Sequence, residues 1–295
     1  MAKGEMRAVG KLRVGMIGLG SIGSESLGYY LQNPSVEVTA LCDVDHGRIE
    51  RLAERHGLRD VLLTSDYRAV ASSEAVDLVS IHASDALHGE MVLFALDCDK
   101  HVFVEKPLAH TIELNLTIMR KARKSTKQVA VGQVLRYFPE FVRIKEIIDA
   151  GLVGDLFYIE ADYLTDQVLR SREVAGRART TYGAAVLTLG VHPLDLMRWY
   201  AGRIVSVKAF SNVNLALPGS GLDECVVAIY QFENGCVGRL ATTWTAYRVR
   251  RPNYGLRLHG SKGAICEDQL TLGPVGQPVS LPPPASPAPP LKAEL

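Results

Sequence analysis

A glycine-rich turn near the N-terminus constrains the fold more than any other feature. The apolar run 12–17 is followed directly by residues 18–23, with the sequence GLGSIG, and then by a helical stretch. Glycine-rich hexamers also arise by chance, so a ligand-free turn is the alternative. A strand, this turn and a helix in that order nevertheless predict the start of a doubly wound parallel sheet that binds a dinucleotide.

Each glycine of the turn has its own physical task. Gly18 permits the tight turn, Gly20 lets a pyrophosphate approach the backbone, and Gly23 lets the helix pack against the strand. Ser21 and Ile22 begin the helix, where unpaired N–H groups and a partial positive charge favour a phosphate. We therefore expect all five residues to bind the cofactor.

An acidic residue follows the second apolar run, 36–42. Asp43 lies twenty residues after Gly23, where a carboxylate accepts hydrogen bonds from the adenosine ribose. Such charged hydrogen bonds contribute roughly 1.5–3 kcal/mol. The same carboxylate repels a 2′-phosphate, so NAD is favoured over NADP. Arg48 keeps NADP as an alternative, because it is able to turn toward such a phosphate.

The first 131 residues alternate strand and helix patterns, which predicts a parallel sheet covered on both faces. We expect a Rossmann domain over 10–131. Its further strands are expected at 76–81, 101–104 and 128–131, and its helices at 45–56, 86–97 and 111–124.

The pattern changes after residue 131, and we expect an α+β domain over 132–273 with a large, mostly antiparallel sheet. Its helix is expected at 138–150 and its strands at 156–164, 204–213, 225–232, 236–245, 254–259 and 264–267. Asn234-Gly235 predicts a hairpin. Eight of the fourteen prolines lie between Pro274 and Pro290, so we expect 274–295 to be a disordered or polyproline-like tail outside any sheet.

Composition excludes several functional classes. A formal net charge of +1 gives no electrostatic footprint for nucleic acid. The N-terminus has no apolar core of signal-peptide length, and no apolar run is long enough to span a bilayer. The five cysteines include no CxxC pair, which favours reduced thiols without a thiolate metal site. We expect a cytoplasmic protein with no metal, membrane or nucleic-acid partner.

Three residues of special chemistry follow the predicted strand 101–104. Glu105-Lys106-Pro107 stands where the carboxyl ends of parallel strands bind ligands. A lysine there is able to hydrogen-bond a substrate hydroxyl and stabilise developing negative charge. The alternative is a surface lysine in a turn.

Taken together, these motifs resemble the glucose–fructose oxidoreductase / inositol dehydrogenase (Gfo/Idh/MocA) family. The resemblance covers roughly residues 12 to 270. It is carried by the segments 18–23, 105–107, 190–195 (GVHPLD), 83–88 (ASDALH) and 132–137 (GQVLRY), together with Asp43.

The resemblance implies a nicotinamide-dependent oxidoreductase acting on a hydroxyl or carbonyl carbon of a sugar, inositol or related polyol. It implies that Lys106 positions the substrate and that His192 is the catalytic acid and base, a role that suits a group with a near-neutral pKa. Ser84, His88, Glu105 and Lys106 join the expected cofactor contacts. Without the family, a lone histidine before a proline is more often structural.

One departure from the family concerns the partner of His192. Thr188 stands where the family usually has an aspartate, four residues earlier on a helix that Pro193 is able to kink. Threonine brings no charge to orient an imidazolium. The candidates to replace it are Asp195, Asp162, Asp166 and Tyr182. The other outcome is weak, altered or absent activity.

The remaining expectations concern the substrate and assembly. Arg177 belongs to a cluster with Arg170, Arg172 and Arg179, which either recognises a carboxylate or phosphate or forms a solvated loop. We expect Arg136, Arg177, Tyr182, Thr188 and Asp195 near the substrate. A homodimer or homotetramer is expected, because the family often pairs through its open sheet face. Two other functions remain: a catalytically altered NAD-binding regulatory or partner protein, and an NAD-dependent glycoside hydrolase.

Overall fold

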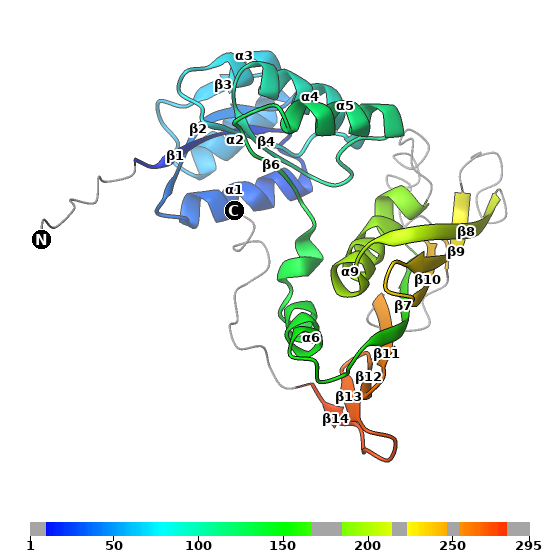
Figure 1. Cartoon of the computed structure of the whole chain (residues 1–295). Helices are drawn as coiled ribbons and strands as arrows, with labels where there is room; N and C mark the ends of the chain where they lie inside the picture. Colours follow the sequence, from blue (N-terminus) through cyan, green and yellow to red (C-terminus); the bar gives the residue numbers. More distant parts are fainter. Residues whose placement is uncertain (1–9, 167–184, 214–222, 247–253, 282–295) are drawn as a thin grey trace, which may run out of the picture. The chain divides into compact units, whose positions relative to one another are not determined.

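The structure is a computed structural model that describes residues 10–166, 185–213, 223–246 and 254–281. The chain forms two compact units, divided between Gly132 and Gln133. Figure 1 shows the first unit in blue to green and the second in green to orange. Each unit buries its own apolar side chains.

The first unit is built on a parallel sheet of six strands in the order β3-β2-β1-β4-β5-β6. Its strands are β1 (Leu12–Ile17), β2 (Val36–Cys42), β3 (Leu62–Thr64), β4 (Leu78–Ile81), β5 (His101–Val104) and β6 (Val129–Val131). The strand order reverses between β1 and β4, which is the switch point where such sheets bind ligands. The predicted doubly wound fold is confirmed.

Helices cover both faces of this sheet (Figure 1). The helices α1 (Ser21–Gln32) and α2 (His46–Arg55) share one apolar cluster with β1 and β2. The helices α3 (Tyr67–Ser72), α4 (Asp85–Asp97) and α5 (Ile112–Ala122) pack on the other face. Asp45, Asp66 and Thr111 cap α2, α3 and α5 with side-chain hydrogen bonds, so these helices begin where the sequence places a capping residue.

The second unit contains a sheet of eight strands in the order β14-β13-β12-β11-β7-β10-β9-β8. Its strands are β7 (Leu156–Leu164), β8 (Ile204–Val213), β9 (Asp223–Phe232), β10 (Val237–Thr243), β11 (Tyr254–Gly260), β12 (Gly263–Cys266), β13 (Gln269–Leu272) and β14 (Val279–Ser280). All neighbours are antiparallel except β7 and β10. The predicted mostly antiparallel sheet is confirmed.

One face of this sheet forms the core of the second unit. Alternate residues of β9 point inward, from Ala228 to Phe232, and share an apolar cluster with α6 (Pro139–Asp149) and α9 (Val191–Ala201). Asn234 and Gly235 turn the chain between β9 and β10, with Gly235 at φ +87°. The predicted hairpin is therefore present.

Two short helical segments precede the long helices. The 3₁₀ segment η1 (Val134–Tyr137) precedes α6, and the π-helical segment η2 (Val186–Gly190) precedes α9. Pro193 lacks the N–H that an α-helix needs inside its length, so it stands in the first turn of α9. Because residues 186–190 are π-helical, Thr188 and His192 do not lie on one continuous α-helix.

The proline-rich segment also departs from expectation. Val279 and Ser280 pair with β13, so the prediction of a tail outside any sheet from residue 274 is wrong for these residues. Neither is a proline, so both keep the backbone N–H that a ladder requires. Leu281 packs against the core of the second unit. Residues 282–295 lie outside the described part of the chain.

Candidate active site

The glycine turn joins β1 to α1 at the carboxyl edge of the parallel sheet. Gly18 has φ +84°, and a Cβ there would lie 2.5 Å from the Ala83 nitrogen. A Cβ on Gly23 would lie 2.0 Å from the Gly18 oxygen. Both positions therefore admit only glycine, and at Gly23 an added Cβ would also lie 3.2 Å from the His82 Cβ, just after β4. At Gly20 an added Cβ meets no described atom within 4 Å, which leaves space for a ligand.

Asp43 closes this turn from the end of β2. Its Oδ2 accepts a hydrogen bond from the Leu19 amide at 2.7 Å, and its Oδ1 accepts one from the Asp45 amide at 2.9 Å. Arg48 Nη1 lies 3.1 Å from each of the two oxygens. Burial opposes the charge of Asp43, but these amides and Arg48 prevail, so its pKa is lowered. The carboxylate is charged and is engaged by the protein's own donors.

A pocket of about 300 Å³ lies beside this turn. Leu19, Gly20, Ser21, Ser24, Arg48, Arg51, Leu52 and Arg55 line it. Arg51 and Arg55 are residues that the sequence analysis missed. Their spacing from Arg48 along α2 places them on the same side of the helix, which is how they could have been found.

The loop after β4 contributes a bracing histidine. His88 is 1% exposed, and its Nδ1 lies 2.8 Å from the Pro107 oxygen while its Nε2 lies 3.0 Å from the Ala83 oxygen. It therefore ties the loop after β4 to the loop after β5. Ser84 precedes α4 as its N-cap residue on the same loop. The geometry gives His88 a positioning task, with both ring nitrogens on backbone carbonyls.

Glu105 and Lys106 follow β5 at the same sheet edge. Burial raises the pKa of Glu105, although Lys106 partly offsets this. Burial lowers the pKa of Lys106, although Glu105 and Asp85 oppose the change. The Glu105 carboxylate also lies against Gly132, where a Cβ would be 3.2 Å from Oε1. Lys106 is thus less hydrated than an ordinary surface lysine, which favours the functional interpretation over the surface turn.

A row of hydrogen-bonded polar side chains is buried next to the glycine turn, and the sequence analysis did not predict it. The Tyr30 hydroxyl donates to Ser80 Oγ at 2.9 Å, and Ser80 Oγ lies 2.7 Å from His82 Nε2. Burial lowers the pKa of His82 to about 3, so this imidazole is neutral. These hydrogen bonds link α1 to the end of β4, next to the turn that contains Gly23.

In the second unit, His192 occupies the first turn of α9. It is 7% exposed, and its ring centroid lies 6.2 Å from that of Tyr163. Tyr163 in turn lies 4.1 Å from Tyr254, centroid to centroid. Gly190, two residues earlier, packs against Thr242 of β10. His192 therefore sits among aromatic and hydroxyl side chains on the inner face of the sheet.

Two of the acids proposed to replace the family's aspartate are held by arginines. Asp195 accepts two hydrogen bonds from Arg136, at 2.6 and 2.7 Å, and Asp162 contacts Arg239 at 3.1 Å. The pair of Arg136 and Asp195 joins η1 to α9, which gives both residues a structural task. Tyr182 and Arg177 lie outside the described residues. Glu224, 1% exposed on β9, is a buried carboxylate that the alternating pattern of its strand could have flagged.

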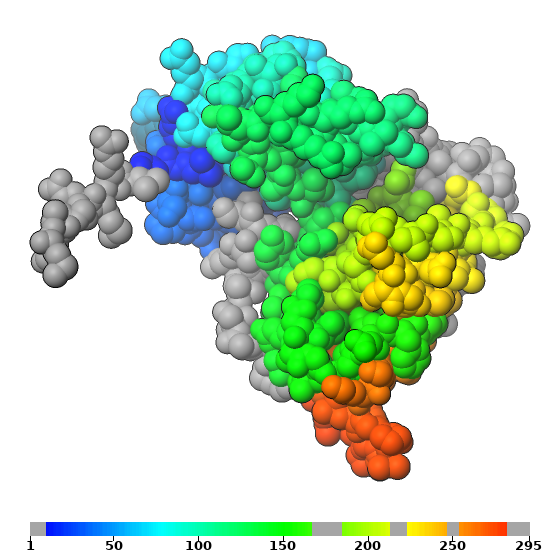
Figure 2. Space-filling view, viewed as in Figure 1, coloured from blue at the N-terminus to red at the C-terminus, as the bar shows by residue number. Residues whose placement is uncertain are grey.

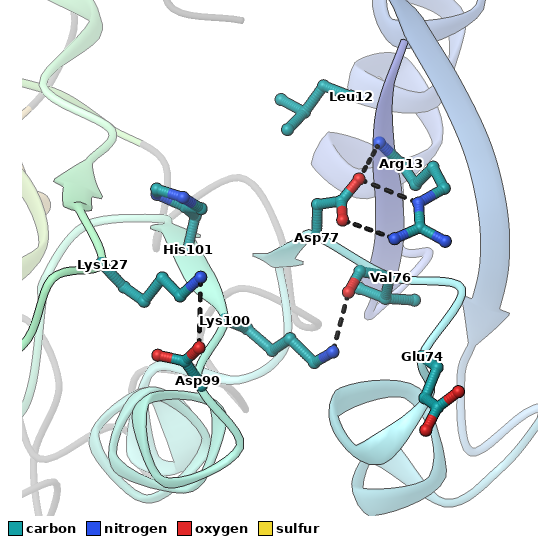
Figure 3. A pocket seen from close by; sticks show the side chains of 9 residues that line it. All are labelled: Leu12, Arg13, Glu74, Val76, Asp77, Asp99, Lys100, His101 and Lys127. Atoms are coloured by element: carbon teal, nitrogen blue, oxygen red, sulfur yellow. Dashed lines mark hydrogen bonds and ion pairs between the residues drawn. The ribbon is translucent and has the colours of Figure 1, made fainter. Parts of the chain in front are cut away.

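A second pocket, of about 430 Å³, lies at the opposite, amino edge of the parallel sheet (Figure 3). Arg13 binds Asp77 there through its side chain, at 2.9 and 2.6 Å. Lys100 Nζ donates to the carbonyls of Ser73 and Val76, and Lys127 faces Asp99 at 3.3 Å. The cations of this pocket are thus occupied within the fold.

Two features are absent from residues 10–166, 185–213, 223–246 and 254–281. None of their helices combines the length and apolar character needed to cross a membrane. No three His, Cys, Asp or Glu side chains in these ranges gather closely enough to hold a metal ion.

Comparisons with known proteins agree with this geometry. The chain resembles curated relatives over much of its length. The chain is 26% identical over 263 residues to an uncharacterised oxidoreductase, YrbE, of Bacillus subtilis, covering 86% of this chain and 73% of that protein. It is 28% identical over 190 residues to inositol 2-dehydrogenase of Salmonella typhimurium, covering 64% of this chain. That match spans about half, 54%, of the relative's length.

A solved structure shares the fold. Scyllo-inositol dehydrogenase from Lactobacillus casei, with bound NAD(H) and scyllo-inositol, superposes with a TM-score of 0.76 at 21% identity, covering 86% of this chain and 75% of that one. Residues 12–133 match the oxidoreductase family with an NAD-binding Rossmann fold, and residues 141–266 match the GFO/IDH/MocA C-terminal domain. The glycine turn, the acid that closes it and the two matched domains together show that the chain belongs to the Gfo/Idh/MocA family of oxidoreductases.

Proposed function

We propose that the protein is an NAD(H)-dependent dehydrogenase or reductase acting on the hydroxyl or carbonyl carbon of a sugar, inositol or related polyol. The observation that carries this is the glycine turn closed by Asp43 at the carboxyl edge of the sheet. Four neighbouring strands, β2, β1, β4 and β5, bring Asp43, the turn, Ser84 and Lys106 to that one edge. The names of the relatives support the substrate class.

The residues present fit a dinucleotide. The amides of Ser21, Ile22 and Gly23 open α1, where no preceding turn accepts their hydrogens, and Gly20 leaves room beside them. A bound nicotinamide dinucleotide supplies hydride transfer. We assign to Lys106 a hydrogen bond to the substrate oxygen. We assign to His192 the proton of the substrate hydroxyl, since an imidazole exchanges a proton near neutral pH.

The His192→Ala variant tests this assignment. We expect kcat to fall by about 10²–10⁴-fold, the usual contribution of a general acid or base, with NADH affinity unchanged. His56→Ala, an exposed histidine after α2, is the matched control and should retain turnover. Steady-state kinetics on a polyol panel and NADH titration give the two readouts. Full turnover in His192→Ala would remove this residue from the mechanism.

A second function is an NAD-binding regulatory or partner protein without turnover. Its support is that Thr188 replaces the usual acid, while Asp195 and Asp162 are held by arginines. Tight NADH binding by the wild-type chain with no turnover on any polyol would select this function.

We further propose a homodimer or homotetramer that pairs through the outer face of the eight-stranded sheet. Large apolar side chains are exposed there, with Phe210 74% and Ile229 55% accessible on neighbouring strands. They flank an ion cluster in which Arg239 and Arg257 both contact Glu160. Light scattering at micromolar concentration should show an oligomer, and a monomer alone would contradict the proposal.

A further inference from the structure

We propose that Thr242 and Trp244, at the end of β10, bind hydroxyl groups of the substrate other than the one that reacts, and so decide which polyol the protein accepts. This inference rests on the proposed function and deepens it by naming residues that distinguish one substrate from another. Its basis is two buried polar atoms that find no hydrogen-bond partner in the part of the chain that the structure describes.

Two neighbours connect Thr242 with His192. Thr242 pairs in register with Tyr163 of β7, and the ring centroid of Tyr163 lies 6.2 Å from that of His192. A Cβ on Gly190, two residues before His192, would lie 3.1 Å from Thr242 Cγ2. Because alternate residues of a strand share a face, Thr242 lies on the same face as Leu240, which belongs to the apolar core of the second unit.

Trp244 directly follows β10 and faces the same interior. Thr243 and Thr245, on either side of it, lie 3.1 Å apart through their hydroxyl oxygens, so these two side chains occupy one side of the chain. The side chain between them therefore points to the other side, which is that of Thr242. Trp244 is 2% exposed, so its indole is enclosed by the fold.

Neither polar atom is satisfied within the described ranges. Thr242 is 0% exposed and its Oγ1 has no hydrogen-bond partner there, and the same is true of Nε1 in Trp244. Such an atom destabilises a fold, because it gives up its hydrogen bond to water and gains none in return. Valine would fill the position of Thr242 with nearly the same shape and without that penalty. A ligand that supplies the missing partners explains why both polar groups are present.

The chemistry of the pair fits an alcohol. An indole nitrogen only donates a hydrogen bond, whereas a threonine hydroxyl both donates and accepts. A polyol hydroxyl is able to accept from Trp244 and to take either role with Thr242, and neither residue carries a charge that would select an ionised group. Because both atoms are enclosed, water does not compete for them. A substrate that lacks the matching hydroxyl therefore leaves them unpaired and binds more weakly.

The test separates ligand binding from folding. It uses the full-length protein with saturating NAD⁺ and whichever of scyllo-inositol, myo-inositol and D-glucose the wild-type protein turns over fastest. Thr242→Val removes the hydroxyl, and Trp244→Phe removes the indole N–H. We expect each variant to raise KM about tenfold or more, with kcat changed less than about threefold and NADH affinity unchanged. In urea denaturation without ligand, we expect the midpoint of Thr242→Val to equal or exceed that of the wild-type protein.

Thr243→Val is the matched control, because this neighbouring hydroxyl accepts a hydrogen bond from the Thr245 amide at 3.2 Å. It should leave KM unchanged and lower the urea midpoint. If Thr242→Val lowers the midpoint as far as the control does, its hydroxyl has a partner within the fold and the inference fails. Unchanged KM in Thr242→Val and Trp244→Phe overturns the inference and leaves the proposed function standing. If the wild-type protein binds NADH but turns over none of the three polyols, the inference falls together with the proposed substrate class.

Discussion

The two edges of the parallel sheet carry similar charged residues but organise them differently. At the amino edge, Arg13 is bound by Asp77, Lys127 faces Asp99, and Lys100 donates to two backbone carbonyls (Figure 3). At the carboxyl edge, the three arginines of the pocket outnumber the carboxylates that contact them, and the amides that open α1 have no side-chain cap. Figure 2 shows one face of this unit in space-filling form, in blue to green.

This difference shows that a charged pocket is not in itself a binding site. The amino-edge pocket is the larger of the two, at about 430 Å³ against about 300 Å³. Its cations nevertheless have partners within the fold, so an incoming anion would have to displace them. At the carboxyl edge, the described amides that open α1 have no acceptor in a preceding turn, which is a condition for recognising phosphate.

The largest effect expected at the carboxyl edge comes from Gly23→Ala. Its Cβ would lie 2.0 Å from the Gly18 oxygen, so the turn must shift. We expect NADH affinity to fall on the order of 100-fold and the free energy of unfolding to drop by about 1–3 kcal/mol. Fluorescence titration and urea denaturation measure the two quantities.

Gly28→Ala on the same helix is the matched control for that change. An added Cβ there meets no described atom within 4 Å, so we expect about 0.5–1 kcal/mol of stabilisation and unchanged NADH binding. Retained cofactor affinity in Gly23→Ala would show that the turn does not hold the dinucleotide.

A smaller effect is expected when the pH is lowered. The free energy of unfolding should respond differently to residues at the two edges of the sheet. His82 has a pKa of about 3 when folded, against 6.5 in a free chain, because it is buried. Its contribution to stability is therefore complete above pH 6.5 and declines as pH falls toward 3. The free energy of unfolding should drop with a slope approaching about 1.4 kcal/mol per pH unit below 6.5. His82→Gln should show a shallower slope between pH 6.5 and 5 in urea titrations.

Asp77 at the amino edge is the control for this pH prediction, and its substitution has the smallest expected effect. Asp77 has a pKa of about 2 because Arg13 donates a hydrogen bond to it, so its contribution persists above 3.8 and is lost only as pH falls toward 2. The side chains of Arg13 and Asp77 are 41% and 35% exposed, so solvent screens the pair. Asp77→Asn should cost about 1 kcal/mol or less and leave the slope between pH 6.5 and 5 unchanged. An equal slope in both variants would contradict the assignment to His82.

Long periodic segments and strong turn residues made much of the fold predictable. β7 and β8 have the predicted bounds, and most other predicted elements differ by one or two residues at their ends. β3 and α3 were missed because they are short, with three and six residues, and leave little pattern to detect. The pairing of Val279 with β13 was missed because the surrounding prolines dominate the composition.

The site was predictable where one residue type has one task, as with Gly18 in the turn. It was less predictable where one charged side chain is contacted by several neighbouring groups. The sequence could place Asp43 after β2, but not the contacts of Arg48 with both of its oxygens, which depend on how α2 packs. The polar chain from Tyr30 to His82 joins residues fifty positions apart, so no local pattern reveals it.

Gly132 has a consequence for anyone who recombines such domains. This glycine is the last residue of the first unit, and a side chain there would press on the Glu105 carboxylate at the cofactor edge. A chimera joined just before it would import a foreign residue against that carboxylate. A chimera joined just after it would keep glycine and acid together, so the fusion point decides whether the Glu105 carboxylate keeps its neighbour.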